Sequence, residues 1–216
     1  MLIDKNYKGL EDLGHRYQIL GDIKTTESLV VDLDKELYVN GSIEAGGSIE
    51  AGGSIEAGGY IEADEFIKAG GSIEAGRSIE AGGYIEAGGS IEADGSIEAG
   101  GSIEAGRYIK ADGYIEAGRY IEADGYIEAD GSIEADEFIK AGGSIEAGEF
   151  IKAGEFYGIS AGLYISCKRT LSFGLKVFAG ICTWGTIPDS GKTITCSRLE
   201  GGGIVEYGIL KETDKL

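Results

Sequence analysis

The sequence predicts an all-β fold, a single-stranded β-solenoid (β-helix) in which short strands stack coil upon coil. Three observations predict it. The unit GSIEAG recurs every six residues from residue 41, Ile fills its third position in all nineteen units from Ile43 to Ile151, and Ala fills its fifth from Ala45 to Ala153. Residues two apart point to the same side of an extended chain. Each unit is therefore a short strand that buries Ile and Ala only against identical strands above and below it.

The other positions of the unit fit this interpretation. The residue between Ile and Ala is Glu in fifteen units and Lys in four, so it faces water. The sixth position accepts only Gly, thirteen times, or Asp, six times. Both residue types tolerate a left-handed or otherwise strained backbone, which predicts a corner. The first position is mostly Gly and admits Arg and Glu, as an exposed site beside a corner would.

Three units per turn predict a triangular coil of about 18 residues. The 21 units from Val31 to Ala153 then make seven coils. Internal copies leave other coils open. The segment ADEFIKAGGSIEAG at 63–76 recurs at 135–148, a shift that is a whole number of coils whether one coil holds two, three or four units. RYIKADGYIEA at 107 recurs nearly unchanged at 119, a shift of two units that suits a flat, two-sided coil. We favour the triangle.

The solenoid is expected to span residues 31–179. At its start VDL (31–33) and LYV (37–39) take the Ile-x-Ala positions. Near its end two inserted residues shift the phase, after which ISA (159–161), ISC (165–167), LSF (171–173) and VFA (177–179) keep the spacing of six. Cys167 thus falls on an Ala position, which predicts a small core residue and not a nucleophile or ligand.

A cap is expected at each end, to shield the apolar side of the first and last coils. In the N-terminal cap, residues 1–30, GLEDLGHRYQ suggests a short helix and YQILGDIKT an irregular first strand. In the C-terminal cap, residues 180–216, the spacing of six is lost. LKVFAGICTW, KTITCSRLEG and GIVEYGIL then predict an antiparallel β cap around the turn GTIPDSGK. Trp184 and Tyr207 are expected in its core.

Charge and cysteine content restrict the function. The chain has 216 residues and a formal net charge of −19, which disfavours direct binding to nucleic acid. No apolar run is long enough to span a membrane, and the charged first residues lack a secretory signal, so we expect a cytoplasmic protein with no membrane partner. Cys167, Cys182 and Cys196 contain no CxxC pair and suit a reducing compartment, with a Cys182–Cys196 disulfide as the alternative.

No enzymatic chemistry is predicted. The only histidine, His15, lies outside the repeats, whereas acyltransferases built on hexapeptide coils use a histidine base, and their repeat pattern fits poorly. EGGG at 200–203 lacks the Lys and Ser/Thr of a phosphate-binding loop. We expect no catalytic residue, no cofactor and no dedicated metal site. The stacked Glu rows are expected to attract loosely bound divalent cations.

The second position of the unit is the candidate interaction site, because it faces outward and varies most. It is Ser in most early units and aromatic in several later ones. Aromatic side chains on a rigid face favour a partner surface, but they also strengthen a ladder by stacking on one another. The candidate residues are Phe66, Tyr108, Tyr114, Tyr120, Tyr126, Phe138 and Phe150.

The run GSIEADEFIKAGGSIEA resembles the core of the bactofilins, a polymer-forming cytoskeletal family with short G-x-I-x-A units. The resemblance covers roughly residues 31–179 and implies a right-handed triangular β-helix whose coil ends self-assemble into filaments. The expected C-terminal cap departs from that family, where short flexible tails follow the core. A more distant similarity, in rod shape and acidic surface, links the chain to the pentapeptide-repeat gyrase inhibitors, whose β-helices imitate DNA.

These observations predict a non-enzymatic structural scaffold or protein-binding solenoid. It would present its acidic and Tyr/Phe rows to a protein partner or to another copy of itself. The alternative is an acidic DNA mimic that occupies the basic groove of a DNA-binding protein. Salt distinguishes the two, because electrostatic mimicry weakens steeply as ionic strength rises.

Overall fold

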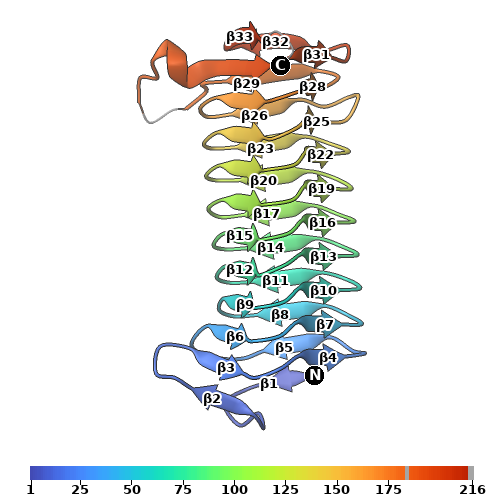
Figure 1. Ribbon diagram of the computed structural model, residues 1–216, viewed down its shortest axis with the longest axis vertical. Helices are drawn as coiled ribbons and strands as arrows, with labels where there is room; N and C mark the ends of the chain where they lie inside the picture. The colour runs from blue at the N-terminus through green and yellow to red at the C-terminus, as the bar shows by residue number, and fades with distance from the viewer. Residues whose placement is uncertain (183–184, 214–216) are drawn as a thin grey trace.

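The computed structural model describes residues 1–182 and 185–213, and it confirms the β-solenoid (Figure 1). Three sheets form the sides of a rod, and the two chain termini lie at opposite ends of it. Most strands have three residues. A single 3₁₀ turn, η1 (Asp189–Lys192), is the one helical element among the residues that the structure describes.

The sheets contain eleven, twelve and ten strands. Sheet A comprises β1 (Leu2–Ile3), β5 (Leu29–Val31), β8 (Ile49–Ala51), β11 (Ile67–Ala69), β14 (Ile85–Ala87), β17 (Ile103–Ala105), β20 (Ile121–Ala123), β23 (Ile139–Ala141), β26 (Ile159–Ala161), β29 (Lys176–Ala179) and β32 (Ile204–Tyr207). Sheet B comprises β2 (Leu10–Asp12), β3 (Tyr17–Ile19), β6 (Leu37–Val39), β9 (Ile55–Ala57), β12 (Ile73–Ala75), β15 (Ile91–Ala93), β18 (Ile109–Ala111), β21 (Ile127–Ala129), β24 (Ile145–Ala147), β27 (Ile165–Cys167), β30 (Thr193–Cys196) and β33 (Ile209–Glu212). Sheet C comprises β4 (Ile23–Thr25), β7 (Ile43–Ala45), β10 (Ile61–Ala63), β13 (Ile79–Ala81), β16 (Ile97–Ala99), β19 (Ile115–Ala117), β22 (Ile133–Ala135), β25 (Ile151–Lys152), β28 (Thr170–Ser172) and β31 (Arg198–Glu200).

The strand register establishes the coil size. In sheet C, Ile97 pairs in parallel with Ile79 below and with Ile115 above, so each coil of the repeat contains three units and contributes one strand to each sheet. The flat coil of two units and the coil of four units are thereby excluded. Stacked aromatic rings at successive coils lie 4.8 Å apart, which is the spacing of hydrogen-bonded strands.

The core is a stack of identical layers. All nineteen repeat isoleucines from Ile43 to Ile151 are at most 1% exposed, and the alanines two residues later are buried too, except the half-buried Ala51. Burying one Ile is worth roughly 1.5–3 kcal/mol. A polar side chain at this position would lose that stabilisation and would leave an unpaired group inside, so the position does not vary.

The corner glycines have a different cause from the one that we predicted. No repeat glycine has a positive φ; the six glycines that do all lie outside the repeats, as Gly14 and Gly201 illustrate. A Cβ on Gly100 would instead lie 2.2 Å from the carbonyl oxygen of Gly82 in the coil below. Gly is favoured at this corner because neighbouring coils approach each other closely there, not because the backbone is left-handed, and six units still accept Asp.

The first coils correct two predictions. The segment 9–18 is not a helix: β2 and β3 pair as an antiparallel hairpin, in which Tyr17 and Ile19 are buried with the two-residue period of a strand. The expected register at VDL (31–33) is also wrong, because Leu29 lies opposite Ile49 and Val31 opposite Ala51. That coil has two additional residues in the corner 32–36. LYV (37–39) takes the predicted positions.

The C-terminal segment is not antiparallel. β30 pairs in parallel with β27, β31 with β28, β32 with β29 and β33 with β30, so the three sheets continue beyond residue 180. The division at residues 30 and 180 stays a prediction, and the sheets run through both boundaries. We expected Tyr207 in the core of the C-terminal cap, but its side chain is 48% exposed. Trp184 lies outside the described residues.

The three cysteines are free thiols, so the alternative Cys182–Cys196 disulfide is not formed. Cys167 lies opposite Ala147 in the buried Ala position, as predicted. Burial raises the pKa of its thiol to about 12.

Among the residues that the structure describes, no helix has the length and apolar character needed to cross a membrane.

Candidate interaction surfaces

The predicted aromatic residues do not form one row. Because each coil holds three units, successive units belong to successive sheets, and aromatics six residues apart lie at three different corners. Each aromatic residue immediately precedes a strand. Phe66, Tyr120 and Phe138 lie at the corner before sheet A, Tyr108 and Tyr126 before sheet B, and Tyr114 and Phe150 before sheet C.

Residues one coil apart do stack. The rings of Tyr108 and Tyr126 lie parallel with centroids 4.8 Å apart, and Tyr120 and Phe138 have the same spacing. Phe66 stacks in this way on Tyr84, which our list of candidates omitted although it occupies the same position of the unit. Such pairs contribute about 0.5–1.5 kcal/mol beyond the area that they bury. Stacking therefore accounts for five of the seven candidates.

Tyrosine hydroxyl groups bind the coil below. Tyr108 donates a hydrogen bond of 2.8 Å to Glu92, and Tyr114 donates one of 2.9 Å to Glu98. The hydrogen bond to a carboxylate is the main reason why the pKa of both tyrosines is raised. For Tyr126, the position that corresponds to Glu92 in the coil below is Lys110, and Tyr126 makes no side-chain hydrogen bond to the described residues. Three further tyrosines donate a hydroxyl hydrogen bond to a Glu carboxylate of the coil below: Tyr60 to Glu44, Tyr120 to Glu104 and Tyr164 to Glu146.

The outward Glu rows are crowded. Four of these residues, called here the crowded carboxylates, have a raised pKa because partial burial disfavours their charge and because neighbouring carboxylates repel it. They are Glu56, Glu62, Glu74 and Glu116. Lysines relieve the repulsion elsewhere, as in the 2.9 Å pair of Lys68 with Glu86. No cluster that could hold a metal ion is found among the described residues.

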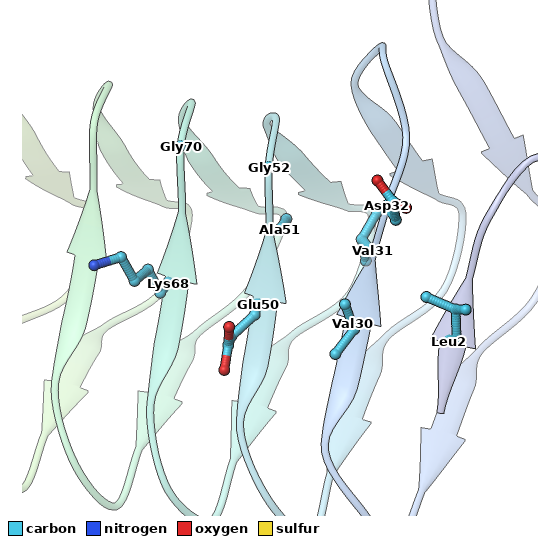
Figure 2. A pocket seen from close by; sticks show the side chains of 9 residues that line it. All are labelled: Leu2, Val30, Val31, Asp32, Glu50, Ala51, Gly52, Lys68 and Gly70. Carbon is cyan, nitrogen blue, oxygen red and sulfur yellow. The ribbon is translucent and has the colours of Figure 1, made fainter.

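A hollow of about 430 Å³ lies on the outer face of sheet A near the N-terminus (Figure 2). Leu2 and Val30 occupy outward positions there and are 54% and 42% exposed. The hollow exists because the enlarged corner 32–36 leaves empty space beneath Gly52, where an added Cβ would meet no atom within 4 Å. Glu50 and Lys68 follow on the same face, so an apolar floor has charged residues beside it.

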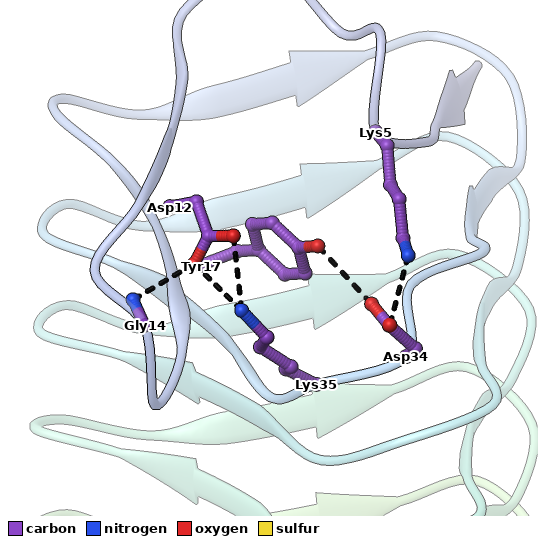
Figure 3. A network of polar contacts seen from close by, with 6 residues as sticks. All are labelled: Lys5, Asp12, Gly14, Tyr17, Asp34 and Lys35. Atoms are coloured by element: carbon purple, nitrogen blue, oxygen red, sulfur yellow. Dashed lines mark hydrogen bonds and ion pairs between the residues drawn. The ribbon is translucent and has the colours of Figure 1, made fainter.

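A polar network holds the enlarged corner in place (Figure 3). Lys5 forms a 2.8 Å ion pair with Asp34, which also accepts a 3.1 Å hydrogen bond from the hydroxyl of Tyr17. Lys35 pairs with Asp12 at 2.7 Å and lies over the Tyr17 ring. The lysine partner in each case lowers the pKa of the aspartate. These groups join the hairpin β2–β3 to the next coil.

Exposed apolar side chains are concentrated at the two ends of the rod. Among the described residues fourteen large hydrophobic side chains are exposed: eight follow residue 155, four precede residue 31, and Tyr84 and Tyr114 lie between. The two-residue insertion near 155 forms a bulge in which Phe156 is 82% exposed. Beyond it, backbone hydrogen bonds join Leu175 to Tyr157 and Ile204 to Leu175, and these three side chains extend the exposed patch through successive coils.

The charge also changes at the C-terminal end. Residues 1–154 contain 32 acidic and 12 basic residues, whereas residues 155–216 contain 6 and 7. In the coil of β26 to β28 the outward position is Ser on all three sheets. Beside it a groove of about 750 Å³ is lined by Lys168, Arg169 and Arg198. The sequence signalled this surface through the change from I-E-A to I-S-A, and our sequence-based candidates missed it.

Comparison of the chain with protein-family models, with curated proteins and with solved structures found no match. The function is therefore inferred from the chemistry of the surfaces described above.

Proposed function

We propose that this chain is a non-enzymatic scaffold rod that binds a protein partner through the apolar surface at its C-terminal end. The observation that carries the proposal is the position of Phe156, which is 82% exposed on a bulge that interrupts an otherwise strict repeat. Large exposed apolar patches on soluble proteins mark interaction sites. The acidic body serves as a spacer, because most of its aromatic side chains stack on one another or bind a carboxylate of the coil below.

The rod also separates two surfaces. Sheet A has eleven strands, so ten steps of about 4.8 Å place the N-terminal hollow and the C-terminal patch up to roughly 48 Å apart. The dense negative charge keeps neighbouring rods apart and attracts loosely held divalent cations. The free thiols are compatible with a reducing, cytoplasmic location, which remains part of the proposal.

A double substitution tests the proposed surface. Phe156→Ser with Leu175→Ser removes apolar area at the C-terminal end, and Tyr84→Ser with Tyr114→Ser removes the two large exposed side chains of the body. We expect the first variant to capture at least tenfold less of a specific partner from host extract, since central apolar anchors dominate binding. The second should capture as much as the wild type. Equal losses, or a loss only in the body variant, would disprove the assignment.

The runner-up function is DNA mimicry, and the charge density favours it. Residues 1–154 carry a net charge of −20 (32 acidic minus 12 basic) over about eight coils. At about 4.8 Å per coil this gives roughly one negative charge per 2 Å, close to the value of about one per 1.7 Å in duplex DNA. A DNA mimic would displace duplex DNA from its target, and this displacement would weaken steeply as salt is raised. Binding through Phe156 should change little over the same range of salt.

A further inference from the structure

We propose that the outer face of sheet C at the C-terminal end binds an extended partner segment with a carboxylate at one residue and a large apolar side chain four residues later. This inference rests on the proposed function and names the chemistry of its partner. Two grooves flank the short strand β28 (Thr170–Ser172): one is basic, and the other, called here the apolar groove, is built around the exposed Phe156 and has charged residues at its edge.

The basic groove is lined by more cationic than anionic side chains. Arg169 pairs with Glu149 at 3.5 Å and Arg198 with Glu200 at 3.0 Å, and each pair is largely exposed. Lys168 is exposed and forms no ion pair with the described residues. Three cations therefore line a groove with one carboxylate, Glu149, in its wall. An incoming carboxylate would gain charge-assisted hydrogen bonds there.

Hydroxyl groups surround these cations. Ser166, Thr170 and Thr195 line the same groove, and their side chains make no hydrogen bond to other described residues. Ser197 differs, because its hydroxyl lies 3.0 Å from the carbonyl oxygens of Lys168 and Arg169. The three unpaired hydroxyls are donors for a carboxylate oxygen. At the position of Ser166, the coil below has Glu146 instead.

The apolar groove, of about 720 Å³, lies at the other end of β28. Phe156 forms one wall, and Ser172 and Phe173 belong to the lining. Four glycines, among them Gly201 and Gly202, leave room for a partner backbone, and the charged residues Asp136, Lys152 and Glu155 complete the lining together with Ala153. A partner side chain inserted beside Phe156 would cover apolar area that is now exposed to water.

The spacing of the grooves fixes the spacing of the ligand groups. Arg169 lines the basic groove, and residues 172–174 line the apolar one, although the Phe173 side chain itself is buried in the core. The four residues of extended chain from Arg169 to Phe173 span about 13 Å at roughly 3.3 Å per residue. In an extended partner, residues i and i+4 point to the same side. Charge complementarity places the acidic residue at the Arg169 end and the apolar residue at the Phe156 end.

Synthetic peptides test this geometry by fluorescence anisotropy. The probe is Gly-Glu-Ser-Ser-Ser-Phe-Gly with a fluorophore, and the spacing control is its isomer Gly-Glu-Ser-Ser-Phe-Ser-Gly. We expect the full-length protein to bind the probe at least tenfold more tightly than the isomer. Phe156→Ser should weaken probe binding tenfold or more, and so should Arg169→Gln combined with Arg198→Gln. Both variants retain the buried Ile ladder, and circular dichroism checks that each is folded.

Matched controls come from the body of the rod. Arg77 lies in the same corner column as Arg169, five coils lower, so Arg77→Gln removes an equivalent charge outside the groove. Arg77→Gln and Tyr114→Ser should bind the probe like the wild type. Equal binding of probe and isomer would overturn the proposal. Full competition by inorganic phosphate would also overturn it, since the site would then bind any oxyanion. A wild-type dimer in sedimentation that becomes a monomer on Phe156→Ser would overturn it too, since the occupant would then be a second copy of the chain.

The outcomes also separate this inference from the proposed function. If Phe156→Ser abolishes capture of a specific partner but no peptide of this pattern binds, the C-terminal surface stands and the partner chemistry is wrong. If Phe156→Ser leaves capture of the partner unchanged, both the proposed function and this inference fail.

Discussion

Truncation of one buried isoleucine tests whether ladder stacking holds the rod together. Ile97 is fully buried in the middle of sheet C between Ile79 and Ile115. Ile97→Ala removes its aliphatic chain from a layer that neighbouring coils prevent from collapsing, so the lost transfer free energy and the cavity add together. Substitutions of this kind cost about 2–5 kcal/mol. Because the layer has identical neighbours on both sides, we expect a loss in free energy of unfolding of about 3 kcal/mol.

Urea unfolding followed by far-UV circular dichroism measures the loss. With an m-value of about 2–3 kcal/mol per molar urea, the midpoint should fall by roughly 1 M or more. Ile115→Ala should give the same shift, because its environment is a copy of that of Ile97. Ile204→Ala is the control: this side chain is 55% exposed, so its removal should cost less than about 0.5 kcal/mol. Equal losses at Ile97 and Ile204, or a loss below about 1 kcal/mol at Ile97, would refute ladder burial as the main stabilising term.

Four further outcomes are expected. Gly100→Ala should destabilise the fold by about 1–3 kcal/mol because its Cβ would meet the carbonyl of the coil below, while Gly52→Ala, with open space around it, should be nearly neutral in the same urea assay. Tyr108→Phe should cost about 0.5–1.5 kcal/mol through the lost hydrogen bond to a carboxylate, whereas Tyr126→Phe should be neutral, and equal effects would contradict the proposed ladder role. The melting temperature should rise as pH falls from 7 to about 5, because the raised pKa of the crowded carboxylates lets the folded chain bind protons that the unfolded chain does not hold. Below about pH 4 the melting temperature should fall again, because the lysine-paired aspartates of the N-terminal network have a lowered pKa and lose their ion pairs when they bind protons. A disulfide reagent should label Cys182 quickly in the folded protein and the two buried thiols only after unfolding, and fast labelling of all three would show that the terminal coils are not closed.

Local patterns were sufficient to predict which side chains enter the core. The alternation of Ile and Ala specifies a buried face because residues two apart share one side of a strand, and this held even for Cys167 in the irregular coils. The same local argument failed at residues 9–33. There, an insertion moved the register by two residues, and a period-two pair, Tyr17 and Ile19, was embedded in a segment that suggested a helix.

The candidate site was predicted less well, because its members meet only through stacking. Tyr108 and Tyr114 are neighbours in the repeat text but lie at different corners, whereas Tyr108 and Tyr126 touch. Arg169 and Arg198 come together although the spacing of six is lost after residue 179, since β31 returns to the sheet that β28 belongs to.

Within the repeats, the amino-acid sequence alone determined the strands, their buried faces, the acidic body and the repeating corners, because each depends on residues within one six-residue unit. Only the tertiary structure decided that three units close a coil, which aromatics stack, and where basic and apolar side chains meet beside β28. These contacts join residues a full coil apart along the chain, as where the corner at Gly100 packs against the carbonyl of Gly82 below, and no pattern within one unit encodes them.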